Sequence, residues 1–335
     1  MKRKTRLIIL LICIVLFFVI APYIVLYSLG YRVDFLNQKI TATGGIYVKT
    51  QPVGAGVSID GATKSTTGYF YNSVFVQNLM PGQHSVSITK NGYYDYQKSL
   101  SVQENEVTKL EQVILFKKDI VFEPVVLEKN QTAKQAFALL TQKTGQINTN
   151  LSLGEDGILY QSDPNLTSKK ALSLVPVKIS PTTLYSLENI SGSIFLHMGK
   201  SLFLFDPKTL SFGAFYNPIT DLVVSPDGKK VLYYNSHELF YYVLNPSTID
   251  ISLGETGKIS LATSTDGIGS AYWLNNDYII FSEGNHVVIS EIDPRGNINS
   301  ITLSSKADQL FFNQQDKKAY ILTGDALMVS ERLVP

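Results

Sequence analysis

The sequence contains a single cysteine, Cys13, which lies inside an apolar run near the N-terminus. The rest of the chain therefore has no cysteine pair for a disulfide and no thiolate cluster for a metal. Charged residues are also scarce, at 17% of the 335 residues, which argues against long solvent-exposed helices. The chain is instead rich in apolar and aromatic residues, with 44% hydrophobic content, 19 Tyr and 17 Phe. This composition favours β-structure with buried cores.

The chain beyond the apolar run has no excess of basic charge. The formal net charge is +1, but Lys2, Arg3, Lys4 and Arg6 all precede the run. Without these four, 25 basic residues remain against 28 acidic residues, a net charge of −3. Because no basic stripe is left to neutralise phosphates, we predict that the protein does not bind nucleic acid.

Leu7 to Leu26 form a stretch of 20 residues without a charge. At ~1.5 Å per residue, a helix of this length matches the hydrocarbon core of a bilayer. Basic residues precede the stretch and none follows until Arg32, which places the N-terminus in the cytoplasm. A cleaved secretion signal is the alternative, because Val19-Ile20-Ala21 has suitable spacing, although Pro22 disfavours cleavage there. We predict an uncleaved signal anchor with its cytoplasmic stub over residues 1–30.

Three tyrosines, Tyr23, Tyr27 and Tyr31, follow the centre of this stretch at intervals of four residues. Tyrosine rings are common where lipid meets water, so these residues suit the outer membrane interface. The predicted location is therefore the cell membrane, crossed once, with the bulk of the chain outside the cytoplasm.

Residues 44–117 contain short alternating apolar segments separated by breaks that carry Gly or Pro. The strands predicted from this alternation are Gly45–Thr50, Gly56–Asp60, Tyr69–Val76, His84–Lys90, Tyr93–Val102 and Glu106–Phe116. Asp60-Gly61 is typical of a two-residue hairpin, Pro81-Gly82 of a type II turn, and Asn91-Gly92 of another tight reversal. Six short strands in about seventy residues predict a small antiparallel β-sandwich.

These residues resemble the PEGA family, an extracytoplasmic β-sandwich module named after a Pro-Glu-Gly-Ala signature. This chain has Pro52-Val53-Gly54-Ala55, so Val53 stands in place of the Glu. The segments that match the usual order and spacing are Val57–Gly61, Leu79–Gly82, His84–Val86 and Gly92-Tyr93. The Thr-Pro that often follows the hairpin is missing, and Ser65–Gly68 stands near that place. The resemblance covers about a fifth of the chain and implies display at the cell surface and binding of envelope material. It supplies no catalytic residue.

From about Ala136 onward, pairs of apolar strands recur. Marker residues in successive units are Ile158, Ile194, Val231, Ile279 and Tyr320, at steps of 36, 37, 48 and 41 residues. A period near forty with several strands per unit is typical of a β-propeller, so residues 118–335 are predicted to form one. About five blades fit this length best. Four or six blades and a stacked β-sandwich are the alternatives, and Ile120–Leu127 is a candidate to complete a terminal blade.

One turn in this region resembles the turn of Tol-type and related WD-like propeller repeats. It is Ser225-Pro226-Asp227-Gly228-Lys229-Lys230, directly before an apolar strand. Asn275–Asp277 and Asn313–Lys318 are weaker versions of the same turn. The predicted fold class is thus all-β, with an N-terminal transmembrane helix, a PEGA-like β-sandwich and a β-propeller.

No catalytic, cofactor-binding or metal-ligating residue is predicted. His237-Glu238 begins like a zinc-protease motif, but Tyr241 stands where a second His is needed. The other histidines, His84, His197 and His286, are isolated beside predicted strands and are more often structural than ligating. A dinucleotide loop is excluded because Gly54-Ala55-Gly56 lacks the third Gly. Calcium loops are also disfavoured, since the two Asp-Gly pairs, Asp60-Gly61 and Asp227-Gly228, are better interpreted as hairpins.

The predicted function is that of a non-catalytic binding or scaffolding protein of the cell envelope. Its expected partners are the membrane and an envelope polysaccharide or protein, held on a propeller face lined by loops, with no cofactor. Aromatic residues that could stack on sugars are Tyr233, Tyr234, Phe240, Tyr241 and Tyr242, of which alternation assigns about half to the core. An envelope glycan hydrolase or esterase on a propeller scaffold, and a purely structural spacer, are the rival functions.

Overall fold

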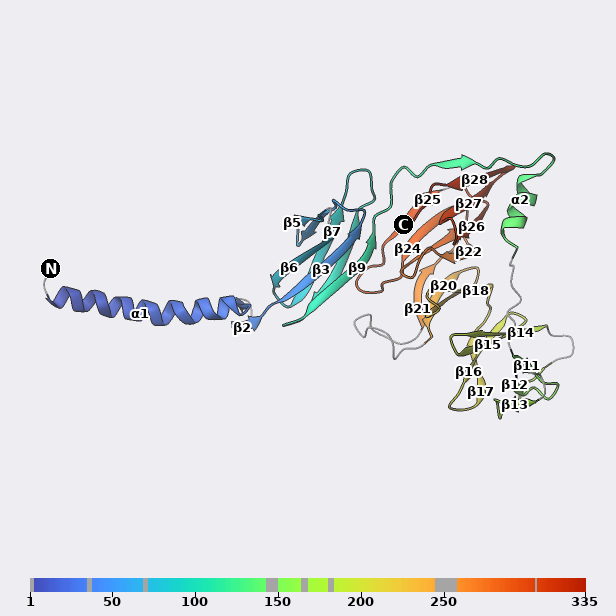
Figure 1. Cartoon of the computed structure of the whole chain (residues 1–335), viewed down its shortest axis with the longest axis horizontal. Helices are drawn as coiled ribbons and strands as arrows, with labels where there is room; N and C mark the ends of the chain where they lie inside the picture. Colours follow the sequence, from blue (N-terminus) through green and yellow to red (C-terminus); the bar gives the residue numbers. More distant parts are fainter. Residues whose placement is uncertain are drawn as a thin grey trace. The chain divides into compact units, whose positions relative to one another are not determined.

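The computed structural model describes residues 3–34, 38–68, 72–142, 150–163, 168–179, 184–244, 258–304 and 306–335 (Figure 1). Strands account for 51% of the residues and helices for 11%, so the fold is mainly β, as predicted. The chain divides into two compact units, Met1–Lys118 with Arg295–Asn297, and Asp119–Pro294 with Ile298–Pro335. The first unit contains a long helix and a small β-module, and the second contains a series of small sheets.

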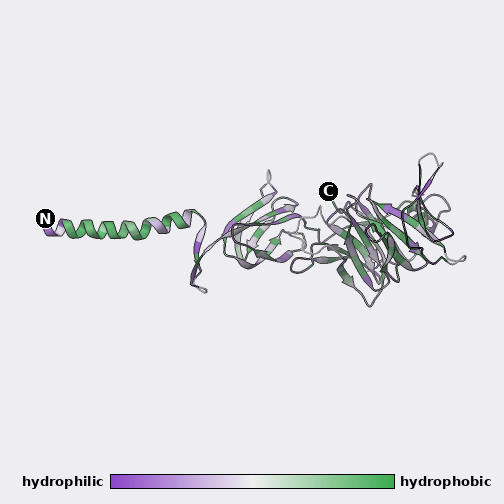
Figure 2. Ribbon diagram, turned by 90° about the horizontal axis from the view of Figure 1, so that it is seen from below, coloured by the Kyte–Doolittle hydropathy of each residue, from purple (hydrophilic) through white to green (hydrophobic). Residues whose placement is uncertain are grey.

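The long helix, α1, runs from Arg3 to Ser28 and contains the whole uncharged stretch, with Pro22 inside it. None of its residues is buried, and Figure 2 shows hydrophobic residues along most of its length. At ~1.5 Å per residue its 26 residues extend about 39 Å, which is enough to cross a bilayer. By length and composition this helix is able to cross a membrane.

A two-stranded hairpin that the sequence pattern did not predict comes directly after α1. Its strands are β1 (Tyr31–Asp34) and β2 (Lys39–Ala42). The backbone N–H and the hydroxyl of Thr43 both donate to the carbonyl oxygen of Gly30, at 2.9 and 2.7 Å. The guanidinium carbon of Arg32 lies 3.6 Å from the centroid of the Tyr27 ring. The base of the hairpin is therefore joined to the last turn of α1.

Two facing sheets form the β-module, which is the next element of the chain. Their strands are β3 (Gly44–Gln51), β4 (Gly56–Ile59), β5 (Ala62–Thr66), β6 (Ser73–Leu79), β7 (Gly82–Thr89), β8 (Tyr96–Val102) and β9 (Val107–Ile114). One sheet has the order β6-β3-β9 and the other β5-β4-β7-β8. Alternate side chains of β8 are buried, and Leu100 is only 1% exposed. Val57, Val86 and Ile46 contribute to the same core, which confirms the predicted sandwich.

The module differs from the prediction in two respects. β3 pairs with β9 in parallel, so the sandwich is not purely antiparallel, and β5 was not predicted at all. Alternation of apolar residues reports which side chains face the core, but it carries no information about strand direction. Gly44 in β3 has a packing role, because a Cβ there would lie 2.3 Å from the carbonyl oxygen of Gln103. Residues 69–71, the start of one predicted strand, lie outside the described residues.

The described residues of the second unit form five small sheets, here called blades 1 to 5. Blade 1 has the strands β11 (Leu151–Leu153), β12 (Leu159–Ser162) and β13 (Lys169–Ala171). Blade 2 has β14 (Tyr185–Ile190), β15 (Ser193–Met198), β16 (Ser201–Asp206) and β17 (Ser211–Tyr216). Blade 3 has β18 (Asp221–Val224), β19 (Lys230–Tyr234), β20 (Glu238–Val243) and β21 (Lys258–Thr263).

Blade 4 has the strands β22 (Ile268–Trp273), β23 (Tyr278–Glu283), β24 (His286–Glu291) and β25 (Ser300–Ser304). Blade 5 has β26 (Gln309–Asn313), β27 (Lys318–Thr323) and β28 (Ala326–Ser330), with β10 (Phe122–Pro124) as its fourth strand. Ile194, Val231, Ile279 and Tyr320 all lie on the second strand of a blade, so the repeat seen in the sequence is the blade repeat. A propeller of about five blades is thus the architecture of this unit.

Successive blades share apolar cores because their central strands bury both faces. In β20, Leu239 and Tyr241 pack against blade 4, while Phe240 and Tyr242 pack against blade 2. The indole N–H of Trp273 in blade 4 donates to the carbonyl oxygen of Val223 in blade 3, at 2.9 Å. A further core joins blades 1 and 2. Blades 1 to 4 are therefore stabilised by cores that they share with their neighbours.

The start of this unit completes its last blade. Strand β10 pairs antiparallel with β28, with Phe122 opposite Ser330, which confirms that Ile120–Leu127 contributes to a terminal blade. A helix that was not predicted, α2 (Ala133–Leu140), comes after β10. Its Phe137 packs against Leu322 and Leu327 of blade 5. This core contains no residue of blade 1 among the described residues.

Candidate functional site

The Asp60-Gly61 hairpin of the β-module is fixed to the neighbouring strand. Both residues have positive φ, 52° and 75°, as a tight two-residue turn requires. The carboxylate of Asp60 accepts from the backbone N–H of Ser85 at 3.0 Å and lies 2.6 Å from Nδ1 of His84. The other ring nitrogen of His84 lies 2.7 Å from the carbonyl oxygen of Met80. His84 therefore connects two turns of the module.

The Pro52–Ala55 signature forms a turn held by one threonine. Thr67 donates its backbone N–H to the carbonyl oxygen of Ala55, and its hydroxyl accepts from the N–H of Ala55 at 3.0 Å. The ammonium of Lys90 donates to the carbonyl oxygen of Val53 and lies 5.7 Å from the ring centroid of Tyr93. Because these contacts use the backbone of residue 53, they are made without the Glu that the resemblance leads one to expect.

The aromatic residues of β19 and β20 lie in the cores between blades. Tyr233, Tyr234 and Tyr241 are buried, with at most 4% of each residue exposed. Phe240 and Tyr242 are half-buried and pack in the core between blades 2 and 3. The rings of Tyr233 and Phe240 stack with centroids 5.5 Å apart. The burial of these rings makes them structural, and none of the five is an open platform for a sugar.

A polar edge, which the sequence pattern did not reveal, borders this aromatic core. The hydroxyl of Tyr216 donates to Oε2 of Glu238 at 3.1 Å, joining blades 2 and 3. Burial raises the pKa of Tyr216, and the hydrogen bond to Glu238 adds to the effect. Lys258 places its ammonium 4.5 Å from the ring centroid of Phe215, and burial lowers the pKa of this lysine. The hydroxyl of Tyr233 is buried and has no hydrogen-bond partner among the described residues.

The turn Ser225–Lys230 has a structural role. Oδ1 of Asp227 accepts from the hydroxyl of Ser225 at 2.6 Å and from the N–H of Lys229 at 3.0 Å. The N–H of Asp227 donates to Oδ1 of Asn276, in the equivalent turn of blade 4, at 3.0 Å. The motif that resembles Tol-type repeats thus closes its own turn and binds the neighbouring blade.

Carboxylates of two blades meet around Lys230 beside this turn. Its ammonium lies 3.5 Å from Oδ2 of Asp227. Burial raises the pKa of Asp277, and repulsion from Asp227 and Asp293 adds to the rise. The positive charge of Lys230 opposes it. Burial alone would raise the pKa of Asp227, but hydrogen bonds from Ser225 and Lys229 and the charge of Lys230 outweigh it and lower that pKa. This cluster lies at the ends of the blades where the first and second strands meet.

Hydrogen bonds also join the connections at the opposite ends of the blades. We call this surface the loop face; it comprises residues 199–200, 217–221, 235–238, 264–267, 283–286, 306–308 and 324–325. The N–H of Ile268 donates to the carbonyl oxygen of Ser236 in blade 3, and the N–H of Gly284 in blade 4 donates to that of Gly267. The connection between blades 3 and 4 is therefore bonded to hairpins of both blades.

The next connection on the loop face is held in the same manner. The N–H of Ala307 donates to the carbonyl oxygen of Asn285 in blade 4, and Oδ2 of Asp308 accepts from the N–H of Gly324 in blade 5 at 2.7 Å. The charged side chains of the loop face are mostly acidic: Asp221, Glu238, Asp266, Glu283, Asp308 and Asp325, against Lys200 and Lys306. The loop face is thus a fixed surface with an excess of negative charge.

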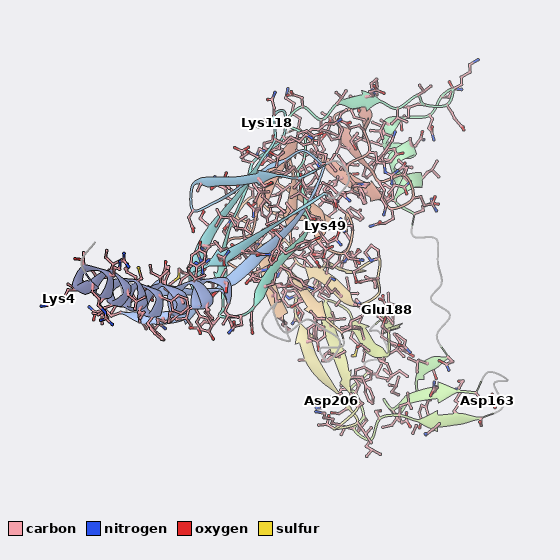
Figure 3. All side chains as sticks on the ribbon, turned by 60° about the vertical axis from the view of Figure 1, so that its left-hand side comes forward. Lys4, Lys49, Lys118, Asp163, Glu188 and Asp206 are labelled. Atoms are coloured by element: carbon pink, nitrogen blue, oxygen red, sulfur yellow. The ribbon has the colours of Figure 1, made fainter. Side chains whose placement is uncertain are left out.

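The structure places the remaining histidines in blades 2, 3 and 4. His237 and His286 belong to the loop face. Nδ1 of His237 lies 3.3 Å from the carbonyl oxygen of Ser264. Nδ1 of His286 is buried and has no hydrogen-bond partner among the described residues. Nε2 of His197 in blade 2 lies 3.6 Å from Oε1 of Glu188, which Figure 3 labels. Within the described ranges, no group of three His, Cys, Asp or Glu side chains is arranged to hold a metal ion.

Comparison with known proteins supports the module and finds propeller-like structures similar to the chain. Residues 43–115 match the PEGA domain. No curated protein matches the chain. Hsv2 of Kluyveromyces lactis resembles it with a TM-score of 0.36 and 9% identity, over 88% of this chain and 76% of Hsv2. The extracellular domain of a hybrid two-component system of B. thetaiotaomicron resembles this chain with a TM-score of 0.32 and 11% identity, over 91% of this chain and 31% of the other. The residues that match the PEGA domain coincide with the β-module, whose strands run from β3 to β9.

Proposed function

We propose that this protein is anchored in a membrane by α1 and exposes its β-module and propeller outside the cytoplasm. The length and apolar surface of α1 support an anchor. Basic residues stand at its N-terminal end, and the next one, Arg32, lies beyond it; this charge distribution supports a cytoplasmic N-terminus. The PEGA match over residues 43–115 supports an extracytoplasmic location for the chain beyond the helix.

The activity that we assign to the propeller is binding through its loop face. The observation that supports this assignment is that backbone hydrogen bonds join the connections between blades 3, 4 and 5 to the hairpins beside them. Loops fixed in this manner lose little conformational entropy when they bind, and binding residues commonly lie on loops that a rigid scaffold positions. No step of catalysis is needed to account for such a surface.

The partner that we propose is a component of the cell envelope, either a polysaccharide or a protein. The carboxylates of the loop face, such as Glu283 and Asp325, outnumber its lysines. Like charges across an interface are unfavourable, so this surface favours a neutral or positively charged target. In this proposal the protein holds its target near the membrane as a scaffold.

The location is tested by adding protease to intact cells that express the chain with an epitope at each end. The C-terminal epitope should be removed, whereas the N-terminal epitope should stay protected until the cells are permeabilised. Protection of both epitopes in intact cells would refute the anchored, exported arrangement. Release of a soluble chain that begins after Ala21 would show a cleaved signal instead.

Binding is tested with the full chain in nanodiscs, screened against cell-wall glycans and fractionated envelope protein. For the target that is retained, Glu283→Gln and Asp325→Asn should each change affinity several-fold, because both residues belong to the loop face. Glu155→Gln, which removes the same charge from the turn between β11 and β12, is the matched control. Turnover of a glycan or ester that one Asp, Glu, Ser or His substitution abolishes would replace the binding function with an enzymatic one.

A further inference from the structure

The hairpin β1–β2 carries an apolar face that is open to solvent. Val33 lies directly opposite Ile40 in the antiparallel register, and Tyr31 points to the same side as Val33. The exposed fractions of these residues are 37% for Tyr31, 42% for Val33 and 57% for Ile40. These three residues form a small exposed apolar patch on one face of the sheet.

The polar face of the same hairpin is turned toward the β-module. The ammonium of Lys39 lies 4.0 Å from Oε1 of Glu104, in the connection between β8 and β9. Thr41 is only 3% exposed, and the N–H of Asn105 donates to the carbonyl oxygen of Thr43 at 3.1 Å. Ala42, on the other face, is also buried at 3% exposed, so the open part of the apolar face consists of Tyr31, Val33 and Ile40.

The position of the hairpin is set by its attachment to α1. The two bonds from Thr43 to the carbonyl oxygen of Gly30, and the stacking of Arg32 on Tyr27, join its base to the helix end. Val33 is five residues from Ser28, the last residue of α1, so its Cα lies within ~18 Å of the end of the helix. Leu29, beside this junction, is 65% exposed and continues the apolar surface.

We propose that the apolar face of this hairpin rests on the lipid surface and forms a second membrane contact beside α1. The proposal rests on the anchoring role of α1 proposed above. A bilayer has roughly 5–7 Å of headgroup region on each side of its hydrocarbon core, so the first residues after the helix emerge within that region. Tyr31 suits this level because its ring is apolar and its hydroxyl polar.

A lipid surface is the occupant that the structure favours because the apolar face continues directly from the apolar surface of α1. Side chains at the interface reach the lipid while the polar side of the same element remains hydrated. In this arrangement the hairpin limits the rotation of the β-module about its anchor. The module would then be held close to the membrane surface.

The experiment uses the full chain in nanodiscs of phosphatidylethanolamine and phosphatidylglycerol, with an environment-sensitive fluorophore on one cysteine. The native Cys13 in α1 is labelled in one preparation, and it is replaced by Ala in the variants Ile40→Cys, Val33→Cys and Lys39→Cys. Lys39→Cys is the matched control, since it neighbours Ile40 but lies on the other face. Each label is quenched separately by aqueous iodide and by lipids that carry a nitroxide near the headgroup or deep in the chain.

The labels at positions 40 and 33 should be several-fold less accessible to iodide than the label at position 39, and the shallow nitroxide should quench them. Equal iodide accessibility at all three positions, while the deep nitroxide quenches Cys13, would refute the second contact and leave the anchor intact. Protection from iodide without quenching by lipid would indicate a protein partner on this face and would also refute the proposal. If the deep nitroxide fails to quench Cys13, the anchoring role itself is wrong.

Discussion

Replacing Tyr233 with Phe should stabilise the propeller, although the change deletes a polar group from a well-packed core. The Tyr233 side chain is fully buried, and its hydroxyl has no hydrogen-bond partner among the described residues. Leaving such a group buried and unpaired costs ~1–3 kcal/mol relative to hydration. The ring contacts do not depend on the hydroxyl: Phe240 stacks at 5.5 Å, and Tyr216 packs edge-on at 4.9 Å.

The expected gain is about 1–2 kcal/mol in the free energy of unfolding, because the phenyl ring keeps the packing while the cost of burying an unpaired hydroxyl is removed. For a unit of this size, this corresponds to a rise of ~2–8 °C in Tm. Tyr216→Phe is the matched control, since its hydroxyl donates to Glu238 at 3.1 Å. Its loss should cost ~0.5–1.5 kcal/mol, so the two Tyr→Phe changes have opposite signs.

Both variants are measured by thermal and urea unfolding, followed by circular dichroism and by tryptophan fluorescence. Trp273 is the only tryptophan and lies in the next core, between blades 3 and 4, so it reports whether a change in one core affects the adjacent blade. The two signals should shift together. A Tyr233→Phe variant that is less stable than the wild type by about 1 kcal/mol or more would refute the reasoning and would indicate a buried partner for the hydroxyl, such as an ordered water.

Three further predictions concern other parts of the chain. Gly61→Val and Gly82→Val should each lower Tm, because φ is +75° and +140° at these positions and a Cβ in that region costs ~1 kcal/mol or more. The control Glu111→Ala, at an exposed position, should leave Tm nearly unchanged. Equal shifts in Tm for all three variants would show that the turns are misplaced. Deleting residues 307–335 removes β26–β28 and leaves β10 unpaired, so the product should be insoluble, and a soluble, cooperatively folding product would contradict an interdependent propeller. Asp277→Asn should raise stability at neutral pH. Burial raises the folded-state pKa of Asp277 above its usual 3.8, so the native protein loses stability as pH rises through that raised pKa and the carboxyl ionises. Asn stays neutral at every pH and does not incur this loss. Urea unfolding of both proteins should therefore give converging stabilities below pH ~3.8, and a constant difference at all pH values would exclude this cause.

The parts of the fold that local sequence signals determine were predictable. Asp60-Gly61 has the two positive φ angles that a tight hairpin needs, and the apolar repeats from Val231 to Tyr320 mark second strands of blades. Helix α2 also has a local signal in the sequence. Thr132 and Gln135 form a capping box, in which the hydroxyl of Thr132 accepts from the N–H of Gln135 at 3.2 Å. The Thr-x-x-Gln spacing that precedes an apolar run is visible in the sequence.

Contacts between distant residues were not predictable in the same way. The parallel pairing of β3 with β9 and the bond from Tyr216 to Glu238 both depend on how separate elements are brought together. The same holds for the loop face, since its carboxylates come from connections of several blades and meet only when the blades pack. Alternation correctly indicated that the aromatic residues of β20 point to two sides, but it could not show that both sides are covered by neighbouring blades.

The pairing of β10 with β28 has a consequence for synthesis. Among the described strands of the propeller, β10 is made first and its partner β28 is made last. Until residues 326–330 have emerged, Phe122–Pro124 has no partner strand and the core of blade 5 is incomplete. The propeller therefore completes its fold only after residues 326–330 have been synthesised, and a chain terminated before them stays incompletely folded and open to proteases and chaperones.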